Sequence, residues 1–298
     1  MSQRCWLGVL LLAGATAVPA QAQVTLEWKL KTGDKFFLEK VVTSKEAVKF
    51  AGQDVLTEKE ETARDSFKVT QANDDAIVLE RKIESAKIKA QGPGAEILDK
   101  LSEKKVGCLF TVSVNPRQRK VTKVEGVEAF LQKTFGDNPQ LRQMLGGALN
   151  EAVFAAEMED LLTAYLPERP VKQGDKWKHK STVPLGPLGS LAAENEYTYA
   201  GKKSVDGKEL DLIERTSTMK YVAPKKGGAL GLQVSKGDLR IDGAKGSVLF
   251  DAARGRLVQM DGRFTGKGTL SVSAMGQDFD LELELEQSLK ARAVEKGD

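Results

Sequence analysis

One seven-residue pattern occurs twice in the chain, and it constrains the fold more than any other feature. Residues 30–36 read Leu-Lys-Thr-Gly-Asp-Lys-Phe, and residues 171–177 read Val-Lys-Gln-Gly-Asp-Lys-Trp. In both copies a Gly-Asp pair, which favours a tight turn, comes directly before a basic and then an aromatic residue. We interpret each copy as the entry to one half of a duplicated β structure. The predicted structural turn residues are Gly33, Asp34, Gly174 and Asp175.

Further matches follow the two turns in the same order. Leu-Glu-Arg at 79–81 corresponds to Ile-Glu-Arg at 213–215, and Leu-Phe at 109–110 corresponds to Leu-Phe at 249–250. The offsets between such matches fall in a narrow range, which favours an internal repeat. The alternative is that β-rich chains reuse the same turn residues by chance.

The order of the segments predicts two β halves with helices between them. We place the first half at 23–124, a helical insert at 125–169 and the second half at 170–298. Apolar and polar residues alternate strictly in the final hairpin, at 269–286, as expected of strands with one buried face. We predict the strongest helix at 148–165, where Pro167 would end it, and an earlier helix that would start at Asn138-Pro139. Between 230 and 250 we predict three short strands.

The predicted fold class is therefore mainly β (α+β). It is a duplicated curved antiparallel sheet or open barrel with a central helical insert against its concave face. The expected core residues are Trp28, Phe36, Cys108, Trp177, Phe250 and Phe279.

The first residues have the features of a secretory signal peptide. Arg4 provides the positive charge, an apolar run covers 6–18, and Ala20-Gln21-Ala22 is a typical cleavage site. We expect an exported chain, periplasmic or extracellular, that starts after Ala22 and has neither a lipid anchor nor a transmembrane segment. Cleavage removes Cys5, so Cys108 would be the one remaining thiol and no intramolecular disulfide is expected.

Charge and composition exclude several functions. The chain has 45 basic and 42 acidic residues and a net charge of +3, so nucleic acid is not a favoured partner. Apolar residues make up 41% of the chain, which is enough for a packed core.

The paired turns, the Leu-Phe matches and the signal peptide together resemble a domain-of-unknown-function family of exported bacterial β-rich proteins. In such a family the Gly-Asp-x-aromatic turn opens a β unit. The resemblance implies a curved antiparallel sheet, loosely similar to envelope lipoprotein carriers. It implies no catalytic residue.

Candidate chemistry is sparse in this sequence. His179 is the only histidine and lies among lysines, which disfavours a catalytic triad, and one histidine with Cys108 cannot form a usual zinc site. Cys108 lies on an apolar strand face, where a buried thiol is expected rather than a nucleophile. The acidic row Asp278–Glu286 is too widely spaced along a strand to hold calcium. We expect no catalytic, cofactor-binding or metal-binding residues and no cofactor.

Three functional hypotheses remain open. The first is a non-catalytic exported protein that binds an apolar small molecule, a lipid or an envelope component. The second is a structural or protein-interaction scaffold of the envelope, with an envelope protein as its partner. The third is a carboxylate-dependent hydrolase, because many acidic residues are present and their pairing cannot be read from the sequence.

Overall fold

The computed structural model describes residues 23–50, 53–92, 95–136, 138, 149–185, 188–224, 233–274 and 277–294. The predicted signal peptide lies outside these residues. In the described part of the chain eleven strands form one sheet, accompanied by three helices. The elements are β1 (Lys35–Phe50), β2 (Gln53–Ala72), β3 (Ile77–Gln91), α1 (Ala95–Lys105), β4 (Leu109–Asn115), β5 (Lys120–Glu125), α2 (Val127–Phe135), α4 (Glu151–Leu162), β6 (Lys176–Pro184), β7 (Ser190–Val205), β8 (Lys208–Val222), β9 (Gln233–Asp251), β10 (Arg256–Ala274) and β11 (Gln277–Val294).

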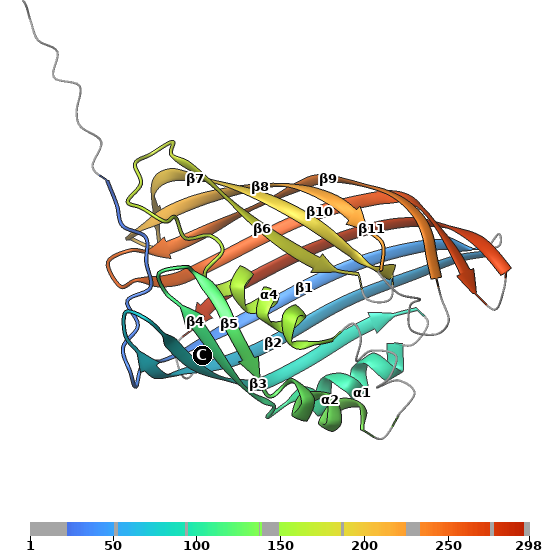
Figure 1. Ribbon diagram of the computed structural model, residues 1–298, viewed down its shortest axis with the longest axis horizontal. Helices are drawn as coiled ribbons and strands as arrows, with labels where there is room; N and C mark the ends of the chain where they lie inside the picture. The colour runs from blue at the N-terminus through green and yellow to red at the C-terminus, as the bar shows by residue number, and fades with distance from the viewer. Residues whose placement is uncertain are drawn as a thin grey trace, which may run out of the picture.

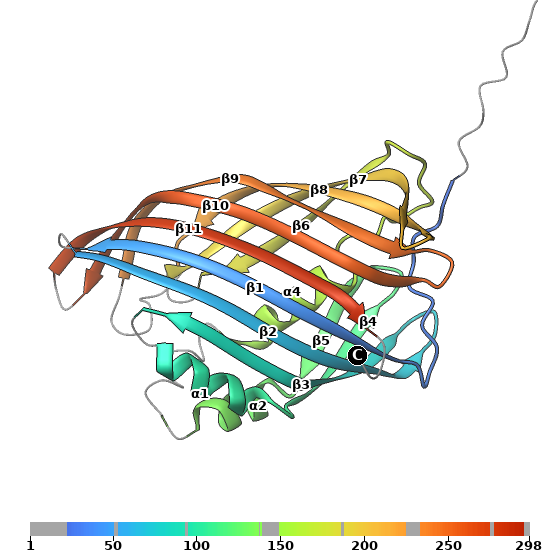
Figure 2. The same cartoon turned by 180° about the vertical axis from the view of Figure 1, so that it is seen from behind.

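Every strand pair is antiparallel, and the strand order is β5-β4-β3-β2-β1-β11-β10-β9-β8-β7-β6. Strands that follow one another in the chain are therefore neighbours, except β5 and β6, which lie at opposite edges of the sheet; β1 and β11 pair in its middle. The sheet curves strongly around α4 (Figures 1 and 2), and its two edge strands, β5 and β6, both contact that helix. The predicted fold class, a curved antiparallel sheet that remains open with helices inside, is confirmed.

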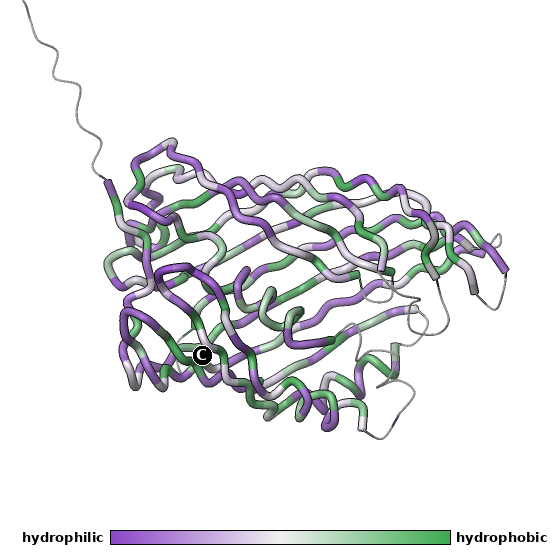
Figure 3. Tube along the Cα trace, in the orientation of Figure 1, coloured by the Kyte–Doolittle hydropathy of each residue, from purple (hydrophilic) through white to green (hydrophobic). Residues whose placement is uncertain are grey.

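Alternation of side chains with period two explains why each strand has an inner and an outer face. On β11, Leu283 and Leu285 are buried, whereas Glu282 and Glu284, which alternate with them along the strand, are exposed. The same alternation of hydrophobic and hydrophilic residues is visible along many strands in Figure 3. An antiparallel sheet with one face against the core and one in water has this pattern.

The interior contains two apolar clusters. The first joins the sheet near the Gly-Asp turns to α2 and α4, and it includes the predicted core residues Phe36, Cys108 and Phe250, with Trp28 and Trp177 partly buried against it. The second lies towards the tips of the long hairpins. Its described members come from strands and the β6–β7 connection, and the predicted core residue Phe279 is partly buried against it.

The helical segment differs from the prediction at its ends. The α4 helix begins at Glu151, because the Asn150 side chain accepts a hydrogen bond from the Val153 N–H at 3.2 Å and caps it. It ends at Leu162, several residues before Pro167, so proline does not terminate it. The predicted helix start at Asn138-Pro139 falls largely outside the described residues, and Asn138 itself is not helical.

The three short strands expected between 230 and 250 are one long strand, β9. Glycines in this segment suggested breaks, but they fit into the sheet. A Cβ at Gly246 would lie 2.2 Å from the Asp261 carbonyl oxygen, so the close approach to β10 requires glycine. Gly243 has φ +61° next to a register shift between Arg263 and Thr265, where a bulge absorbs one residue.

Candidate functional site

The two Gly-Asp turns have the same local structure. Gly33 and Gly174 have φ of +94° and +91°, a region that favours glycine. The carboxylate of Asp34 accepts a hydrogen bond from the Lys31 N–H at 3.1 Å, and Asp175 accepts one from Lys172 at 3.0 Å. Both carboxylates thus accept a hydrogen bond from within their own turns, and Asp34 also accepts one from Arg256 at 3.2 Å.

Each turn delivers its aromatic residue onto an aromatic partner of the next strand. Phe36 stacks on Phe67 with ring centroids 4.9 Å apart, and Trp177 stacks on Tyr197 at 5.8 Å. Both pairs face the concave side of the sheet, where they pack in the first apolar cluster. Stacked aromatic pairs of this kind stabilise the sheet by about 1 kcal/mol beyond their buried area.

Charged side chains attach α4 to the first half of the sheet. Asp65 is fully buried and accepts hydrogen bonds from Nε and Nη2 of Arg81 at 3.1 and 2.8 Å. Lys40 Nζ lies 2.7 Å from Oε1 of Glu157 on α4 and 3.5 Å from Oδ2 of Asp65. Desolvation by itself would raise the pKa of Glu157. The positive charges of Lys40 and Arg81 have a larger, opposite effect and lower this pKa to about 2. Glu157 therefore acts as a counter-ion at neutral pH, although 43% of its side chain is exposed and water screens these attractions.

The next residues of α4 face the second half of the sheet. Burial raises the pKa of Asp160 to about 6, although Arg215 and His179 oppose the shift. The neighbouring Glu159 lies 3.2 Å from Nε2 of His179 and accepts a hydrogen bond from the Val121 N–H at 3.1 Å. Adjacent carboxylates with separated pKa values can act as an acid–base pair. Neither carboxylate, however, lines the two pockets described below.

The other chemical candidates from the sequence have structural surroundings. Burial raises the pKa of the Cys108 thiol, and its Sγ lies 3.9 Å from the Lys104 carbonyl oxygen. Asp280 accepts a hydrogen bond from Ser271, and Glu284 pairs with Lys267. The acidic row on β11 thus has separate partners. Within the described ranges, no group of three or more His, Cys, Asp or Glu side chains is arranged to hold a metal ion.

A pocket of about 540 Å³ lies where β11 ends. Val294, the last residue of that strand, pairs with Phe37 of β1, whereas β1 itself begins at Lys35 and β10 begins at Arg256. Neighbouring strands are about 4.8 Å apart, so β1 and β10 are separated by about 10 Å beyond the end of β11. Within the described residues, the sheet is thus open at this point.

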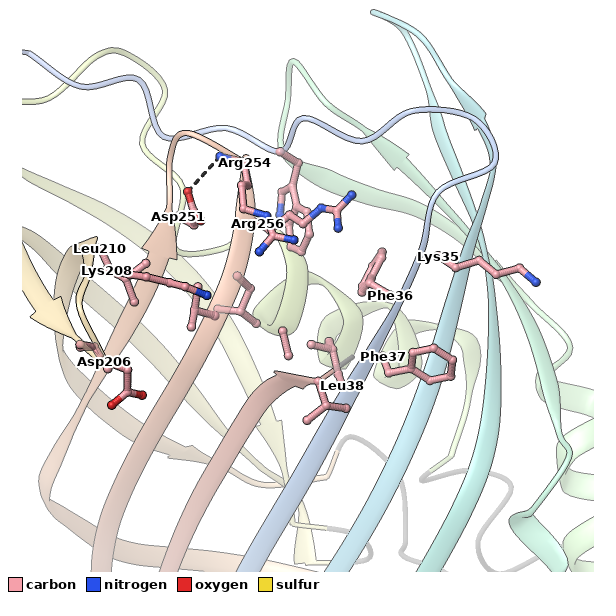
Figure 4. Close-up of a pocket in the computed structure, with 16 residues that line it drawn as sticks. Lys35, Phe36, Phe37, Leu38, Asp206, Lys208, Leu210, Asp251, Arg254 and Arg256 are labelled. Atoms are coloured by element: carbon pink, nitrogen blue, oxygen red, sulfur yellow. Dashed lines mark hydrogen bonds between the residues drawn. The ribbon is translucent and has the colours of Figure 1, made fainter. Parts of the chain in front are cut away.

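The floor of this pocket belongs to the first apolar cluster. Phe36, Leu38 and Leu257 are buried core residues that reach it, and Trp28 is partly buried beside them. Figure 4 shows Phe36 and Leu38 on the same strand, with Arg254 and Arg256 on the opposite side of the pocket. Apolar walls with a few polar groups at the mouth are typical of small-molecule sites, and the volume lies within their range of about 300–1,000 Å³.

The segment before β1 closes this end of the molecule. Val24 forms a bridge with Val171, and the Lys29 N–H donates to the Gly255 carbonyl oxygen at 3.1 Å. The Trp28 indole N–H donates to the carbonyl oxygen of Leu162, at the end of α4. The N-terminal segment therefore positions Trp28 in the pocket and ties α4 to both halves of the sheet.

A second pocket of about 410 Å³ lies on the other side of the same end. Charged residues are prominent in its lining, among them Arg119, Glu168 and Arg169, and His179 also reaches it. His179 Nε2 lies 3.2 Å from Oε1 of Glu159 on α4.

Sequence reasoning missed the pocket of β11, because its residues come from five separate places in the chain. They lie in the segment before β1, the start of β1, the β7–β8 turn, the β9–β10 turn and the end of β11. One local signal was present: Asp206-Gly207 forms a two-residue hairpin with φ of 50° and 75°, as expected of this dipeptide. It predicts a hairpin, but nothing in it indicates that the hairpin borders a pocket.

The part of the chain that the structure describes contains no helix long and apolar enough to cross a membrane.

A search of curated proteins finds no match to the sequence. Among solved structures, one described as "Lipid-protein interactions in lipovitellin" is similar, with a TM-score of 0.50 and 8% identity over 90% of this chain. The chain spans 26% of that lipovitellin chain, so the likeness concerns the fold alone.

An outer membrane channel from Pseudomonas putida F1 is also similar, with 9% identity over 90% of this chain and 98% of the channel, but its TM-score of 0.23 carries no argument. The family profile of DUF6263, a family of unknown function, matches residues 65–228. That match runs from β2 to beyond β8 and covers more than half of the sequence. The expected resemblance to a domain-of-unknown-function family is confirmed, and the chain belongs to DUF6263.

Proposed function

We propose that this protein is an exported, non-catalytic binding module that takes an apolar small molecule or lipid into the pocket at the end of β11. One observation carries the proposal: a pocket of about 540 Å³ at the end of β11 has the apolar core residues Phe36, Leu38 and Leu257 at its floor. Burying an apolar ligand against them would remove its surface from water, at about 25 cal/mol for each Å².

Two further observations support the same function. The lipovitellin structure that shares this curved-sheet fold is described for its lipid–protein interactions. The signal peptide predicted at residues 1–22 would export the chain to the periplasm or the medium, where apolar molecules need a carrier. We propose a bacterial envelope location on the same grounds.

The pocket can be blocked without disturbing the core. Ala293 lines it and is exposed, so Ala293→Phe would place a ring in the pocket rather than in the packed interior. Ala192→Phe is the matched control, because Ala192 is an exposed alanine on the outer face of β7. Binding of an apolar fluorescent dye such as N-phenylnaphthylamine should saturate in the wild type and in Ala192→Phe. It should weaken about tenfold or more in Ala293→Phe, a change of about 1.4 kcal/mol.

Native mass spectrometry and organic extraction of the purified protein provide a second readout. A co-purifying lipid or other apolar molecule that is displaced by the dye supports the proposal. No saturable dye binding, or equal binding by all three proteins, would show that this pocket is not a binding site.

The scaffold hypothesis remains the second candidate, favoured by apolar side chains at the tip of the β1–β2 hairpin. Val55 and Leu56 are 36% and 48% exposed there. An envelope partner seated on this tip would be lost on Leu56→Ser in a pull-down from envelope extract, while dye binding would be unchanged.

A further inference from the structure

The mouth of the pocket at the end of β11 carries more basic than acidic residues. Four basic and two acidic side chains line it, whereas its floor is apolar. The charged lining residues are Lys35, Lys208, Arg254, Arg256, Asp206 and Asp251.

Three of the cations have no counter-ion among the described residues. Lys35, Lys208 and Arg254 do not lie within ion-pair distance of a described carboxylate, and all three are exposed. Arg256, by contrast, is paired with Asp34, with 3.2 Å between Nη2 and Oδ2. An unpaired cation beside an apolar pocket is positioned to attract a negatively charged group.

Within the described residues, neither acidic lining residue forms an ion pair with Lys208 or Arg254. Oδ1 of Asp251 accepts a hydrogen bond from the backbone N–H of Arg254 at 2.9 Å, which fixes the β9–β10 turn. In Figure 4, Asp206 lies at the edge of the group, apart from both arginines. The side chain of Lys208 extends towards the middle of the group, whereas Lys35 and Phe37 point away from it. Lys208 and Arg254 are therefore the unpaired cations at this mouth that an anion could reach (Figure 4).

We infer that the ligand of this pocket is an amphiphile with an anionic head group, a carboxylate or a phosphate. Its apolar chain lies on Phe36, Leu38 and Leu257, and its head group is held at the mouth by Lys208 and Arg254. This inference rests on the proposed function, because it names the class of apolar ligand that the same pocket takes. Binding is non-covalent and needs no co-reactant.

The expected preference is moderate because the mouth is exposed to water. An exposed ion pair contributes up to about 1 kcal/mol, which is a factor of up to about five in Kd for each cation. Dodecanoate and dodecyl phosphate should bind the wild type roughly tenfold more tightly than dodecanol, which has the same chain and no charge. Salt should reduce this preference, since it screens exposed charges.

The test uses the full chain and measures displacement of the fluorescent dye by each of the three amphiphiles. In the double variant Lys208→Gln/Arg254→Gln, the anionic ligands should lose most of their tenfold advantage while dodecanol binds as before. Lys290→Gln/Arg263→Gln is the matched control, because it removes one lysine and one arginine from exposed positions on β11 and β10, outside the pocket. This control should retain the preference.

Each outcome decides a different point. Equal affinity for all three amphiphiles, or an unchanged preference in Lys208→Gln/Arg254→Gln, would overturn the head-group inference and leave the apolar pocket intact. Failure of all three to displace the dye would overturn the proposed function itself. Stronger binding of dodecyl phosphate than dodecanoate indicates a phospholipid-type head group, and the reverse order indicates a fatty acid; either order supports the inference.

Discussion

Asp65 provides a direct test of how α4 is held in the sheet. Its side chain is fully buried and accepts two hydrogen bonds from Arg81, whose side chain is only 5% exposed. Asp65→Asn keeps the shape but removes the charge, which leaves Arg81 and Lys40 with Glu157 as their one nearby carboxylate. Removing one partner of a buried pair costs about 3–5 kcal/mol, and because Glu157 remains we expect a loss of about 3 kcal/mol.

The assay is equilibrium unfolding in urea, from which the free energy of unfolding is obtained by linear extrapolation. Lys45→Gln is the matched control, since Lys45 pairs with Glu58 across β1 and β2 at 2.9 Å, with both side chains about half exposed. That substitution should cost less than about 1 kcal/mol. If Asp65→Asn costs no more than this control, the buried pair does not hold the structure as argued.

Three further predictions concern other parts of the molecule. The pKa of Asp160 is higher in the folded state than in the unfolded chain, so the contribution of Asp160 to the free energy of unfolding falls as pH rises from about 4 to about 6. Asp160→Asn should remove this decrease, measured by urea unfolding, and should raise the free energy of unfolding at pH 7 by up to about 3 kcal/mol. Gly33→Ala should cost about 1 kcal/mol, because φ is +94° but no atom lies within 4 Å of the new Cβ. Gly126→Ala should cost clearly more in thermal unfolding, because its Cβ would lie 2.3 Å from the Leu109 carbonyl oxygen. The Cys108 thiol is buried and its pKa is raised, so its reaction with a thiol reagent should be limited by the rate of unfolding. Rapid labelling of the native protein would contradict this prediction.

Local sequence patterns predicted the elements well where alternation was strong. The strand with Cys108, Phe110 and Val112 on one face has those side chains buried and Leu109 exposed. The helix predicted at 148–165 contains α4, Glu151–Leu162. Period two and helical spacing record burial directly, which is why these elements could be read from one sequence.

The internal repeat is still a prediction, although the two halves share details that the sequence did not reveal. Asp65 lies two residues before Phe67, and Asn195 lies two residues before Tyr197, each facing the concave side. In the first half a buried charge pairs with Arg81, whereas Asn195 bonds to Ser181 and Ser217. The sequence alone does not show which half of the sheet attaches α4 through charged residues, because this depends on the register of β1, β2 and β3.

The pocket could not be predicted because it depends on where the strand pairing is placed. Alternation in β11 predicts its buried face, but not that its described part reaches Val294 opposite Phe37, whereas β1 begins at Lys35 and β10 at Arg256. The sequence also does not show that the turns at 205–208 and 251–256 lie next to residues 35–38. Such contacts depend on strand order, which a single sequence leaves open.

The central claim is that an apolar chain enters the pocket beside Trp28, and one fluorescence measurement tests it most directly. The predicted signal peptide carries Trp6, so its removal leaves two of the three tryptophans. Trp177→Phe then leaves Trp28 as the sole reporter, and Trp28→Phe leaves Trp177, which lines the other pocket. Titration with bromine-labelled dodecanoate should quench Trp28 saturably and leave Trp177 nearly unchanged. Equal quenching of the two, or no saturable quenching of Trp28, would contradict the account.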